Sequence, residues 1–196
     1  MKVAIISVQG DVEEHVLITK RAMDNIGIDG EAIATISKEE IKKSDAIILP
    51  GGESTTISKL IHQRGIDKEI KEAAMKGKPI MGTCAGSILL AKHGNEQIKK
   101  TKTKLLGLMD IWVKRNAFGR QIESFQVKLD IKNIGYFNAV FIRAPAIVKT
   151  GSNVDILSEF EGYVVAARQK NLLALSFHPE LADDTRIHEY FLRMAE

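Results

Sequence analysis

The sequence is poor in several features that would mark other classes of protein. It has one cysteine in 196 residues, which excludes an intrachain disulfide framework and suits a reducing compartment. No Pro/Gly/Ser-rich linker divides it, and no apolar run approaches the roughly 18 residues of a membrane-spanning helix. A formal charge of +3 is too weak for a nucleic-acid-binding surface without clustering. We therefore expect one cytoplasmic domain, residues 1–196, without a membrane or nucleic-acid partner.

The first half of the chain alternates predicted strands with predicted helices. Residues 3–8 and 46–49 are continuous apolar runs, which is typical of strands buried on both faces. Residues 12–26 have apolar side chains at helical spacing, with Asp11 among the acidic residues at the start and Gly27 at the end. The other predictions here are strands at 31–36 and 79–81, a short helix opening at 37–40, and helices at 55–61 and 67–75. This order favours βαβ units and a parallel sheet.

The second half has a different pattern. Residues 93–104 are polar and rich in lysine, so we expect the basic run 99–104 to be a solvated loop, with a partner-binding surface as the alternative. Short β-like runs follow at 108–113, 121–129, 140–143, 154–160, 163–168 and 172–176, and an amphipathic helix is predicted at 185–194. We predict an α/β fold with a mainly parallel central sheet, to which this half adds antiparallel or mixed strands.

The single cysteine lies in a motif of its own, Gly82-Thr83-Cys84-Ala85-Gly86, between two apolar runs. This pattern is typical of a nucleophile elbow, a tight strand-to-helix turn that holds a reactive side chain up and needs glycines on both sides. At a helix N-terminus the partial positive charge stabilises a thiolate. The alternative is that Cys84 is a small buried hydrophobic residue, but such a residue would gain nothing from the two glycines.

A histidine and a carboxylate follow the last apolar run, in Phe177-His178-Pro179-Glu180. If both lie on an extended strand end, they share a face, so Glu180 can hold one imidazole nitrogen while the other faces Cys84. In isolation this pattern would more often be a solvated loop. The remaining histidines lie in predicted helices or loops and receive no catalytic role: His15, His62, His93 and His188.

Two further features could bind a substrate. The turn Pro50-Gly51-Gly52-Glu53-Ser54 follows a buried strand and lacks the full pattern of a phosphate loop, so an oxyanion site is the better interpretation and a plain strand-ending turn the alternative. Arg115, Arg120 and Arg143 lie near strand-like segments, where a guanidinium could bind a carboxylate; surface charge is the default explanation for each.

Together these motifs resemble those of class I glutamine amidotransferases, and in particular of the glutaminase subunits of pyridoxal 5′-phosphate synthase. The elbow and the His-x-Glu are common to the class. Two other segments, residues 51–56 and 115–121, are specific to this family. The segments that carry the resemblance span nearly the whole chain: Gln9-Gly10 with Glu14-His15, residues 49–56, Gly82-Thr83-Cys84-Ala85-Gly86, Arg115-Asn116-Ala117-Phe118-Gly119-Arg120-Gln121, residues 141–145 and residues 176–181.

The resemblance implies a three-layer, flavodoxin-like sandwich. It implies that Cys84 attacks the side-chain amide of L-glutamine, with His178 as base and then acid and Glu180 orienting it. It implies an oxyanion site at the backbone N–H groups of Gly52 and Ala85, and a glutamine pocket formed by Gly52, Glu53, Ser54, Arg115, Ile142 and Arg143. No cofactor and no metal are implied. The implied partner is a (β/α)₈ synthase subunit in a large hetero-oligomer, which would receive the ammonia.

Three other functions remain open at this stage. Another class I amidotransferase would keep the elbow and the His-x-Glu but not the two family-specific segments. A cysteine hydrolase of related fold would lack the His-x-Glu after the last strands. A non-catalytic regulatory subunit would not need Cys84, His178 and Glu180 together.

Overall fold

The computed structural model describes residues 1–118 and 124–195. In this part of the chain one sheet has the strand order β2-β1-β3-β4-β12-β11-β9-β6-β5, with β10 paired to β11, and β7 and β8 form a separate hairpin. The strands are β1 (Lys2–Ile6), β2 (Glu31–Thr35), β3 (Ala46–Leu49), β4 (Ile80–Thr83), β5 (Ala91–Gly94), β6 (Met109–Lys114), β7 (Ser124–Ile131), β8 (Gly135–Ile142), β9 (Ala146–Thr150), β10 (Asp155–Phe160), β11 (Tyr163–Gln169) and β12 (Leu172–Leu175).

The direction of the strands changes in the middle of this sheet. From β2 to β12 the neighbours are parallel, and β12 is then antiparallel to β11, which is antiparallel to β9. At the far end, β9 and β6 are antiparallel and β6 and β5 parallel. The predicted combination of a mainly parallel core with added antiparallel strands is therefore confirmed.

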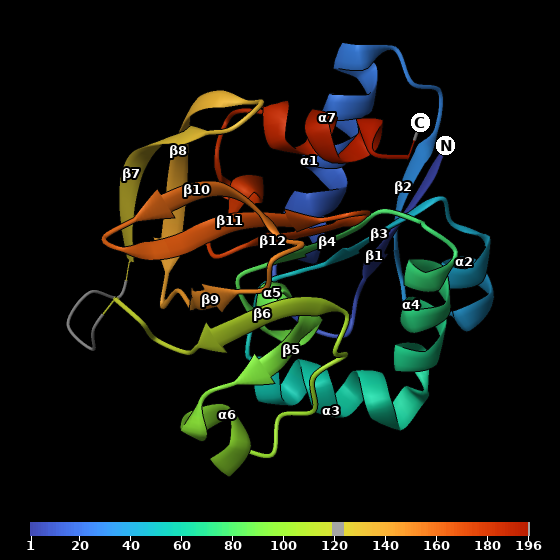
Figure 1. The fold of residues 1–196 in the computed structure, drawn as a ribbon. Helices are drawn as coiled ribbons and strands as arrows, with labels where there is room; N and C mark the ends of the chain where they lie inside the picture. The colour runs from blue at the N-terminus through green and yellow to red at the C-terminus, as the bar shows by residue number, and fades with distance from the viewer. Residues whose placement is uncertain (119–123, 196) are drawn as a thin grey trace.

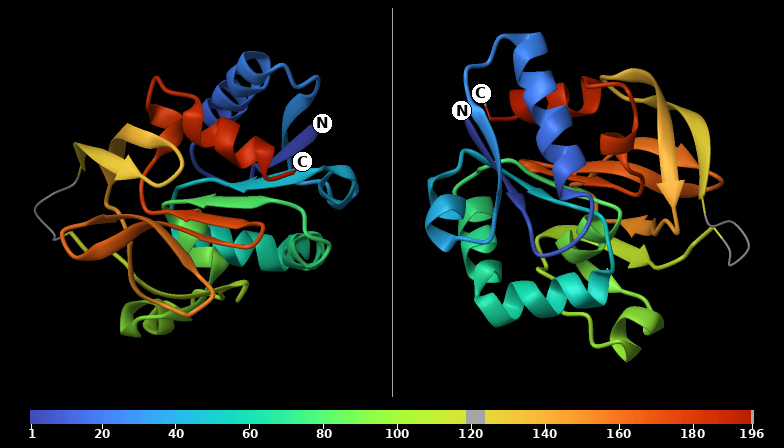
Figure 2. Two further views of the ribbon diagram at one scale, coloured as in Figure 1. Left: turned by 45° about the horizontal axis from the view of Figure 1, so that its top comes forward. Right: turned by 180° about the vertical axis from the view of Figure 1, so that it is seen from behind.

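Helices cover both faces of the sheet and give the fold three layers (Figures 1 and 2). Helices α1 and α7 pack together on one face, and α2, α3 and α4 lie on the other. The N- and C-termini lie close together in every view. The helices are α1 (Val12–Ile26), α2 (Lys38–Lys43), α3 (Ser54–Arg64), α4 (Ile66–Met75), α5 (Ala85–Leu90), α6 (Glu96–Lys100) and α7 (Arg186–Arg193), with a short 3₁₀ helix, η1 (Pro179–Leu181).

The continuous apolar runs form strands because both of their faces are buried. In β1, Val3 and Ile5 belong to the core under α1 and α7, whereas Ala4 and Ile6 belong to the core on the opposite face. Successive side chains of a strand point to opposite faces, so a strand between two helical layers needs apolar residues at every position. The central strands therefore contribute side chains to both apolar cores of the molecule.

The described structure also differs from the sequence predictions. Strands β5 and β9 were not predicted, and neither was α6, which occupies part of the basic run 99–104 that we expected to be a loop. Helix α6 forms because Asn95 caps it, its side chain accepting the N–H of Ile98, and because Ile98 is buried. Residues 121–123 of the predicted strand 121–129 lie outside the described residues.

The carboxyl ends of four neighbouring parallel strands meet at one edge of the sheet. The loops that leave β1, β3, β4 and β12 contain residues 7–11, 50–53, 84 and 176–178. In open α/β sheets, ligands bind outside the carboxyl ends of the strands. In the described part of the chain, no helix combines the length and the apolar character needed to cross a membrane.

Candidate active site

Cys84 lies in a strained turn between β4 and α5. Its backbone has φ 47° and ψ −106°, a conformation that L-residues rarely adopt and that marks a nucleophile elbow. A side chain at Gly82 would place its Cβ 2.6 Å from the backbone of Gly86, and a side chain at Gly86 would lie 2.0 Å from the carbonyl oxygen of Leu49. Both glycines are thus required by close backbone contacts, as the motif predicts.

His178 and Glu180 come together, but not on a strand as we expected. Strand β12 ends at Leu175, His178 precedes η1 and Glu180 belongs to it. The tight 3₁₀ turn brings the two side chains to one side, with Nδ1 of His178 2.7 Å from Oε1 of Glu180. The predicted pairing is present, whereas its predicted cause, strand alternation, is wrong.

A second carboxylate contacts the same imidazole nitrogen. The Oδ2 atom of Asp11 lies 3.3 Å from Nδ1 of His178, although we assigned Asp11 only to the start of a helix. Asp11 does precede α1, but its side chain makes no capping hydrogen bond there. The hydrogen bond to His178 lowers the pKa of Asp11. The imidazole therefore has two acidic partners.

The charge of His178 reflects these neighbours. Burial lowers the pKa of the imidazole, but the carboxylate of Asp11, the nearby sulfur of Cys84 and the carboxylate of Glu180 outweigh burial and raise its pKa to about 12. Burial raises the pKa of Glu180, and the hydrogen bond from His178 partly offsets this. These neighbours therefore favour the protonated form of the imidazole.

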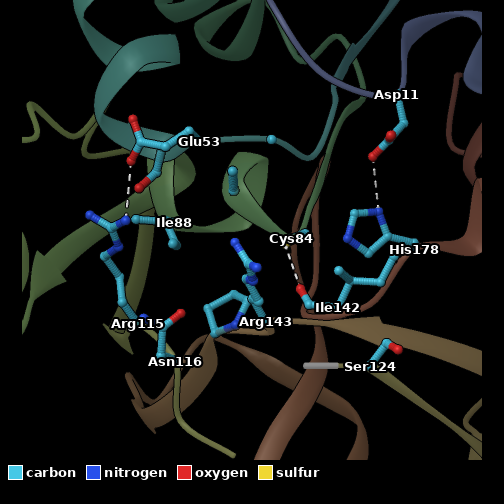
Figure 3. A pocket seen from close by; sticks show the side chains of 14 residues that line it. Asp11, Glu53, Cys84, Ile88, Arg115, Asn116, Ser124, Ile142, Arg143 and His178 are labelled. Atoms are coloured by element: carbon cyan, nitrogen blue, oxygen red, sulfur yellow. Dashed lines mark hydrogen bonds and ion pairs between the residues drawn. The ribbon is translucent and has the colours of Figure 1, made fainter. Parts of the chain in front are cut away.

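Cys84 and His178 line one cavity of about 610 Å³. The Sγ of Cys84 is 3.8 Å from the carbonyl oxygen of Ile142, and the Nε2 atom of His178 has no hydrogen-bond partner among the described residues. Figure 3 shows Asp11 and His178 on one side, Glu53 and Arg115 on the other, and Cys84 between them. The site is therefore open at the position where a substrate carbonyl would meet the sulfur.

The cavity brings together most of the residues that the sequence singled out. Its lining includes Gly52, Glu53, Ser54, Cys84, Ala85, Arg115, Ile142, Arg143 and His178, all of them predicted. Glu180 lies behind His178 and does not line it. Arg120 falls outside the described residues. Sequence reasoning gave no site role to several other lining residues: Asp11, Ile88, Asn116, Ser124 and Pro145.

The glycine turn after β3 packs against both the imidazole and the first loop. A Cβ at Gly51 would lie 2.5 Å from Cε1 of His178, and a Cβ at Gly10 would lie 1.8 Å from the carbonyl oxygen of Gly51. The side chain of Gln9 accepts the N–H of Glu53 at 3.4 Å. The loop of residues 7–11 and the glycine turn are therefore in direct backbone contact.

Glu53 anchors the entrance of α3. Its carboxylate accepts the N–H groups of Thr55 and Thr56 at 3.1 and 2.7 Å, and it pairs with Arg115 at 3.1 Å. Partial burial raises the pKa of Glu53, but the bonds from Thr55 and Thr56 outweigh it and lower the pKa to about 2. Arg115 also donates to the hydroxyl of Thr55, so its guanidinium is held at the cavity wall.

Three carboxylate and imidazole groups of the site could in principle hold a metal ion. Ligand atoms of Asp11, His178 and Glu180 lie within 4.8 Å of one another. The Nδ1 atom of His178, however, is already at hydrogen-bond distance from Glu180. We therefore assign these groups to a hydrogen-bonded arrangement around the Nδ1 proton of His178, and not to a metal site.

Comparison with known proteins gives the family of this chain. The model of the SNO glutamine amidotransferase family matches residues 5–196. This chain belongs to that family. The pyridoxal 5′-phosphate synthase subunit PdxT of Archaeoglobus fulgidus is 66% identical over 196 residues, covering 100% of this chain and 99% of the relative. The PdxT of Methanocella arvoryzae is 54% identical over 195 residues, covering 99% and 97%.

Solved structures also resemble this member of the SNO family. A crystal structure described as a glutamine amidotransferase is 43% identical, with a TM-score of 0.88 and 98% of both chains covered. The structure of PurLQS from Thermotoga maritima matches with a TM-score of 0.66 at 16% identity, over 100% of this chain and 98% of that chain. The second likeness concerns the fold alone. The predicted three-layer α/β architecture of a glutamine amidotransferase is confirmed.

Buried histidines of this amidotransferase lie beside the candidate triad, contrary to our expectation. His15 of α1 has its Nε2 atom 3.2 Å from Oε2 of Glu180, and its Nδ1 atom 3.2 Å from Nε2 of His188 in α7. His15 lies 163 positions before His178 in the sequence, so only the tertiary packing could reveal the contact. His62 and His93 do not line the cavity.

Replacing Glu53 with alanine will test its structural role. Loss of the cap should reduce the free energy of unfolding by about 1 kcal/mol at pH 7. The pKa of Glu53 is lowered on folding, so its ionised form stabilises the fold above pH 4.5, the ordinary value, and this stabilisation is lost as pH falls towards about 2. Urea unfolding at pH 7, 4 and 3 should show the difference from the unmutated protein shrinking.

The matched control for Glu53→Ala is Glu72→Ala. The two side chains are about equally exposed, at 44% and 49%, but Glu72 only faces Lys76 one turn along α4. A surface pair of this kind contributes little to stability. A loss from Glu53→Ala that stays constant from pH 7 to pH 3 would contradict the assigned role of the carboxylate.

Proposed function

We propose that this chain is the glutaminase subunit of a pyridoxal 5′-phosphate synthase, hydrolysing L-glutamine to L-glutamate and ammonia in the cytoplasm as one domain, residues 1–196. The observation that supports this most is the meeting of Cys84, on its elbow, with His178 in one cavity. The PdxT relatives, which are aligned over the whole chain, support the pathway. A free catalytic thiol also favours a reducing compartment.

The first half-reaction forms a thioester. The Nε2 atom of His178 takes the thiol proton of Cys84, and the thiolate attacks the carbonyl carbon of the glutamine side-chain amide. The backbone N–H groups of Gly52 and Ala85 would hold the resulting oxyanion; Ala85 is the first residue of α5, where helix N–H groups have no acceptor within the helix. Loss of one such donor typically raises the barrier by about 3 kcal/mol.

The leaving group takes its proton from the same imidazole. His178 donates the proton to the amide nitrogen, ammonia leaves, and a γ-glutamyl thioester of Cys84 remains. The thiolate contributes to the high pKa of His178, and acylation of the sulfur removes this contribution. The imidazole is thus a better acid at the step where a proton must be given up. In the second half-reaction, His178 takes a proton from water, which attacks the thioester and releases glutamate.

The rest of the cavity would bind the amino-acid end of glutamine. Arg115 or Arg143 supplies a guanidinium for the α-carboxylate. Glu53 supplies a negative charge that suits the α-amino group. The hydroxyl of Ser54 is buried without a hydrogen-bond partner among the described residues, which leaves it available to a ligand. Ile142 contributes its backbone carbonyl beside the sulfur.

Ammonia must reach its acceptor without equilibrating with water, because at pH 7 it would mostly become unreactive ammonium. We place the acceptor site on a separate (β/α)₈ synthase subunit, assembled with this chain in a large hetero-oligomer. The docking face would include Gln9 and Gly10 with the turn at Gly51 and Gly52, since backbone contact joins these loops beside His178. Docking can thereby complete the oxyanion site, and glutamine hydrolysis should rise when the synthase is added. An unchanged rate would disprove this coupling.

The proposed chemistry can be tested by labelling. A glutamine analogue with an electrophilic group in place of the amide should form one adduct, on Cys84, as located by mass spectrometry of the digested protein. L-Glutamine should protect against labelling, whereas L-asparagine, one methylene shorter, should not. An adduct elsewhere, or no adduct in the presence of the synthase, would refute the glutaminase proposal. Ammonia release from glutamine but not from peptides would separate this function from that of a cysteine peptidase.

A further inference from the structure

A buried cluster of polar side chains lies directly behind the candidate triad. His15, Thr83 and His188 are each 0% exposed, and the side chain of Glu180 is also fully buried. Nε2 of His15 lies 3.1 Å from the hydroxyl of Thr83 and 3.2 Å from Oε2 of Glu180. Thr83 is the last residue of β4 and precedes Cys84. One imidazole therefore contacts both the strand that carries the nucleophile and the acid that holds the base.

The hydrogen-bond partners fix which ring nitrogens carry protons. Nδ1 of His188 is buried and has no partner among the described residues. Leaving a buried N–H without an acceptor is rarer than leaving an acceptor unused, so the proton of His188 belongs on Nε2. This N–H donates to Nδ1 of His15, 3.2 Å away. The proton of His15 must then be on Nε2, where it faces Thr83 and Glu180.

Both histidines are neutral in this arrangement. Burial lowers the pKa of His188 to about 3, and burial together with the nearby His188 and His178 lowers the pKa of His15 well below its ordinary value. A neutral His15 does not compete with His178 for the negative charge of Glu180. It offers only an N–H group to the oxygen that His178 does not use.

The carboxylate of Glu180 is thus approached from two sides. Oε1 is bonded to Nδ1 of His178 at 2.7 Å, whereas Oε2 has no hydrogen-bond partner within residues 1–118 and 124–195 and lies 3.2 Å from Nε2 of His15. A small rotation of the His15 ring would share its proton between Thr83 and Glu180. An acid held at both oxygens cannot rotate away from the base that it orients.

We propose that His15 is a positioning residue for glutamine hydrolysis: its Nε2–H fixes the carboxylate of Glu180 relative to the end of β4, and His188 fixes the tautomer of His15. This inference rests on the proposed function, in which Glu180 orients His178. His15 does not line the cavity, so it acts through Glu180 and does not touch substrate. Its role should appear in the chemical step and not in glutamine binding.

Two variants of His15 distinguish the effect of its N–H group on activity from the effect of the volume of its ring. His15→Leu removes the donor, and we expect a kcat lower by about 10- to 100-fold with KM nearly unchanged, as is typical for outer partners that orient a site. His15→Gln keeps an N–H group near the position of Nε2 and should recover most of the loss. Thr19→Val is the matched control, because Thr19 is buried one turn along α1 and its hydroxyl has no partner among the described residues.

The assay uses the full chain with the synthase subunit, and labelling of Cys84 by the glutamine analogue is followed across pH. If Glu180 is held less firmly, it stabilises the protonated imidazole of His178 less well, and the pKa of His178 falls. The decline of the labelling rate at alkaline pH should then begin at lower pH in His15→Leu but not in Thr19→Val. The other titratable groups facing the His15 and His178 rings are Asp11, Cys84, Glu180 and His188, and all remain in each variant. Circular dichroism of each variant will test whether it is folded.

Three outcomes would overturn the inference. A kcat of His15→Leu within about twofold of Thr19→Val would show that Glu180 needs no further support. Equal losses in His15→Leu and His15→Gln would show that ring volume, not the donor, matters. Nitrogen NMR of the unmutated protein that placed the His15 proton on Nδ1 would exclude the mechanism even if no variant folds. An unmutated protein that neither hydrolyses glutamine nor labels at Cys84 would instead refute the proposed function.

Discussion

Replacing Cys84 with alanine will abolish ammonia release from glutamine. Without the sulfur no thioester can form, and loss of a nucleophile that acts with its base typically costs on the order of 10⁶ in kcat. Cys84 is 7% exposed and small, and alanine adds no atoms to the strained turn. The fold and the docking loops should therefore be preserved. Glutamate formation, measured with an excess of synthase, should fall to the background rate.

The control for this prediction is retention of partner binding. Cys84→Ala and the unmutated chain should bind the synthase with similar affinity in sedimentation or calorimetry. Cys84→Ser should also be inactive or nearly so, because a hydroxyl is a far weaker nucleophile than a thiolate at neutral pH. Substantial glutamine hydrolysis by the alanine variant would contradict the nucleophile assignment, and unchanged pyridoxal phosphate production from glutamine would contradict the whole mechanism.

The second large effect concerns the two carboxylates at His178. Converting the acid of a Ser-His-Asp triad to its amide lowers kcat by about 10⁴. We expect Glu180→Gln to lose less, about 10²- to 10³-fold, because Asp11 lies 3.3 Å from the same Nδ1 atom and continues to accept its proton. Asp11→Asn alone should cost only severalfold. The double variant should approach the full 10⁴-fold loss.

A double-mutant cycle on kcat measures this coupling. Asp183→Asn serves as the control for removing a carboxylate nearby, since Asp183 is exposed and pairs with Arg21. If the double variant is no slower than Glu180→Gln alone, Asp11 does not act as a second acceptor for His178. A loss of about 10⁴ in the single Glu180→Gln variant would lead to the same conclusion.

The sequence was most informative where one physical requirement decides the residue types. The central strands are buried on both faces, so β1 and β3 appear as unbroken apolar runs. The elbow glycines at positions 82 and 86 leave no room for a side chain: a Cβ at Gly82 would meet Gly86, four residues on, and a Cβ at Gly86 would meet Leu49 of the neighbouring strand β3. Such requirements leave a visible pattern, and the corresponding predictions of the fold and of a tight strand-to-helix turn at Cys84 agree with the structure.

The predictions failed where tertiary contacts decide. Strands β5 and β9 are short, and pairing with β6 keeps them extended despite weak local patterns. Asp11 was assigned only to the acidic first turn of a helix, because the partner of its carboxylate, His178, lies 167 positions further along the chain. His15 likewise meets Glu180 and His188 only because α1 packs against both η1 and α7. The local sequence pattern carries no information about such tertiary contacts.

The position of β12 has a consequence for how the enzyme is made. This strand lies between β4 and β11 and leads directly to His178, yet it is the last strand of the described chain to leave the ribosome. Until it inserts, the thiol at position 84 has neither its base nor the strand that accepts its backbone N–H at Leu175. A nascent polypeptide that has not yet reached residue 178 therefore holds Cys84 without His178, and the two side chains can meet only after β12 has been made and inserted.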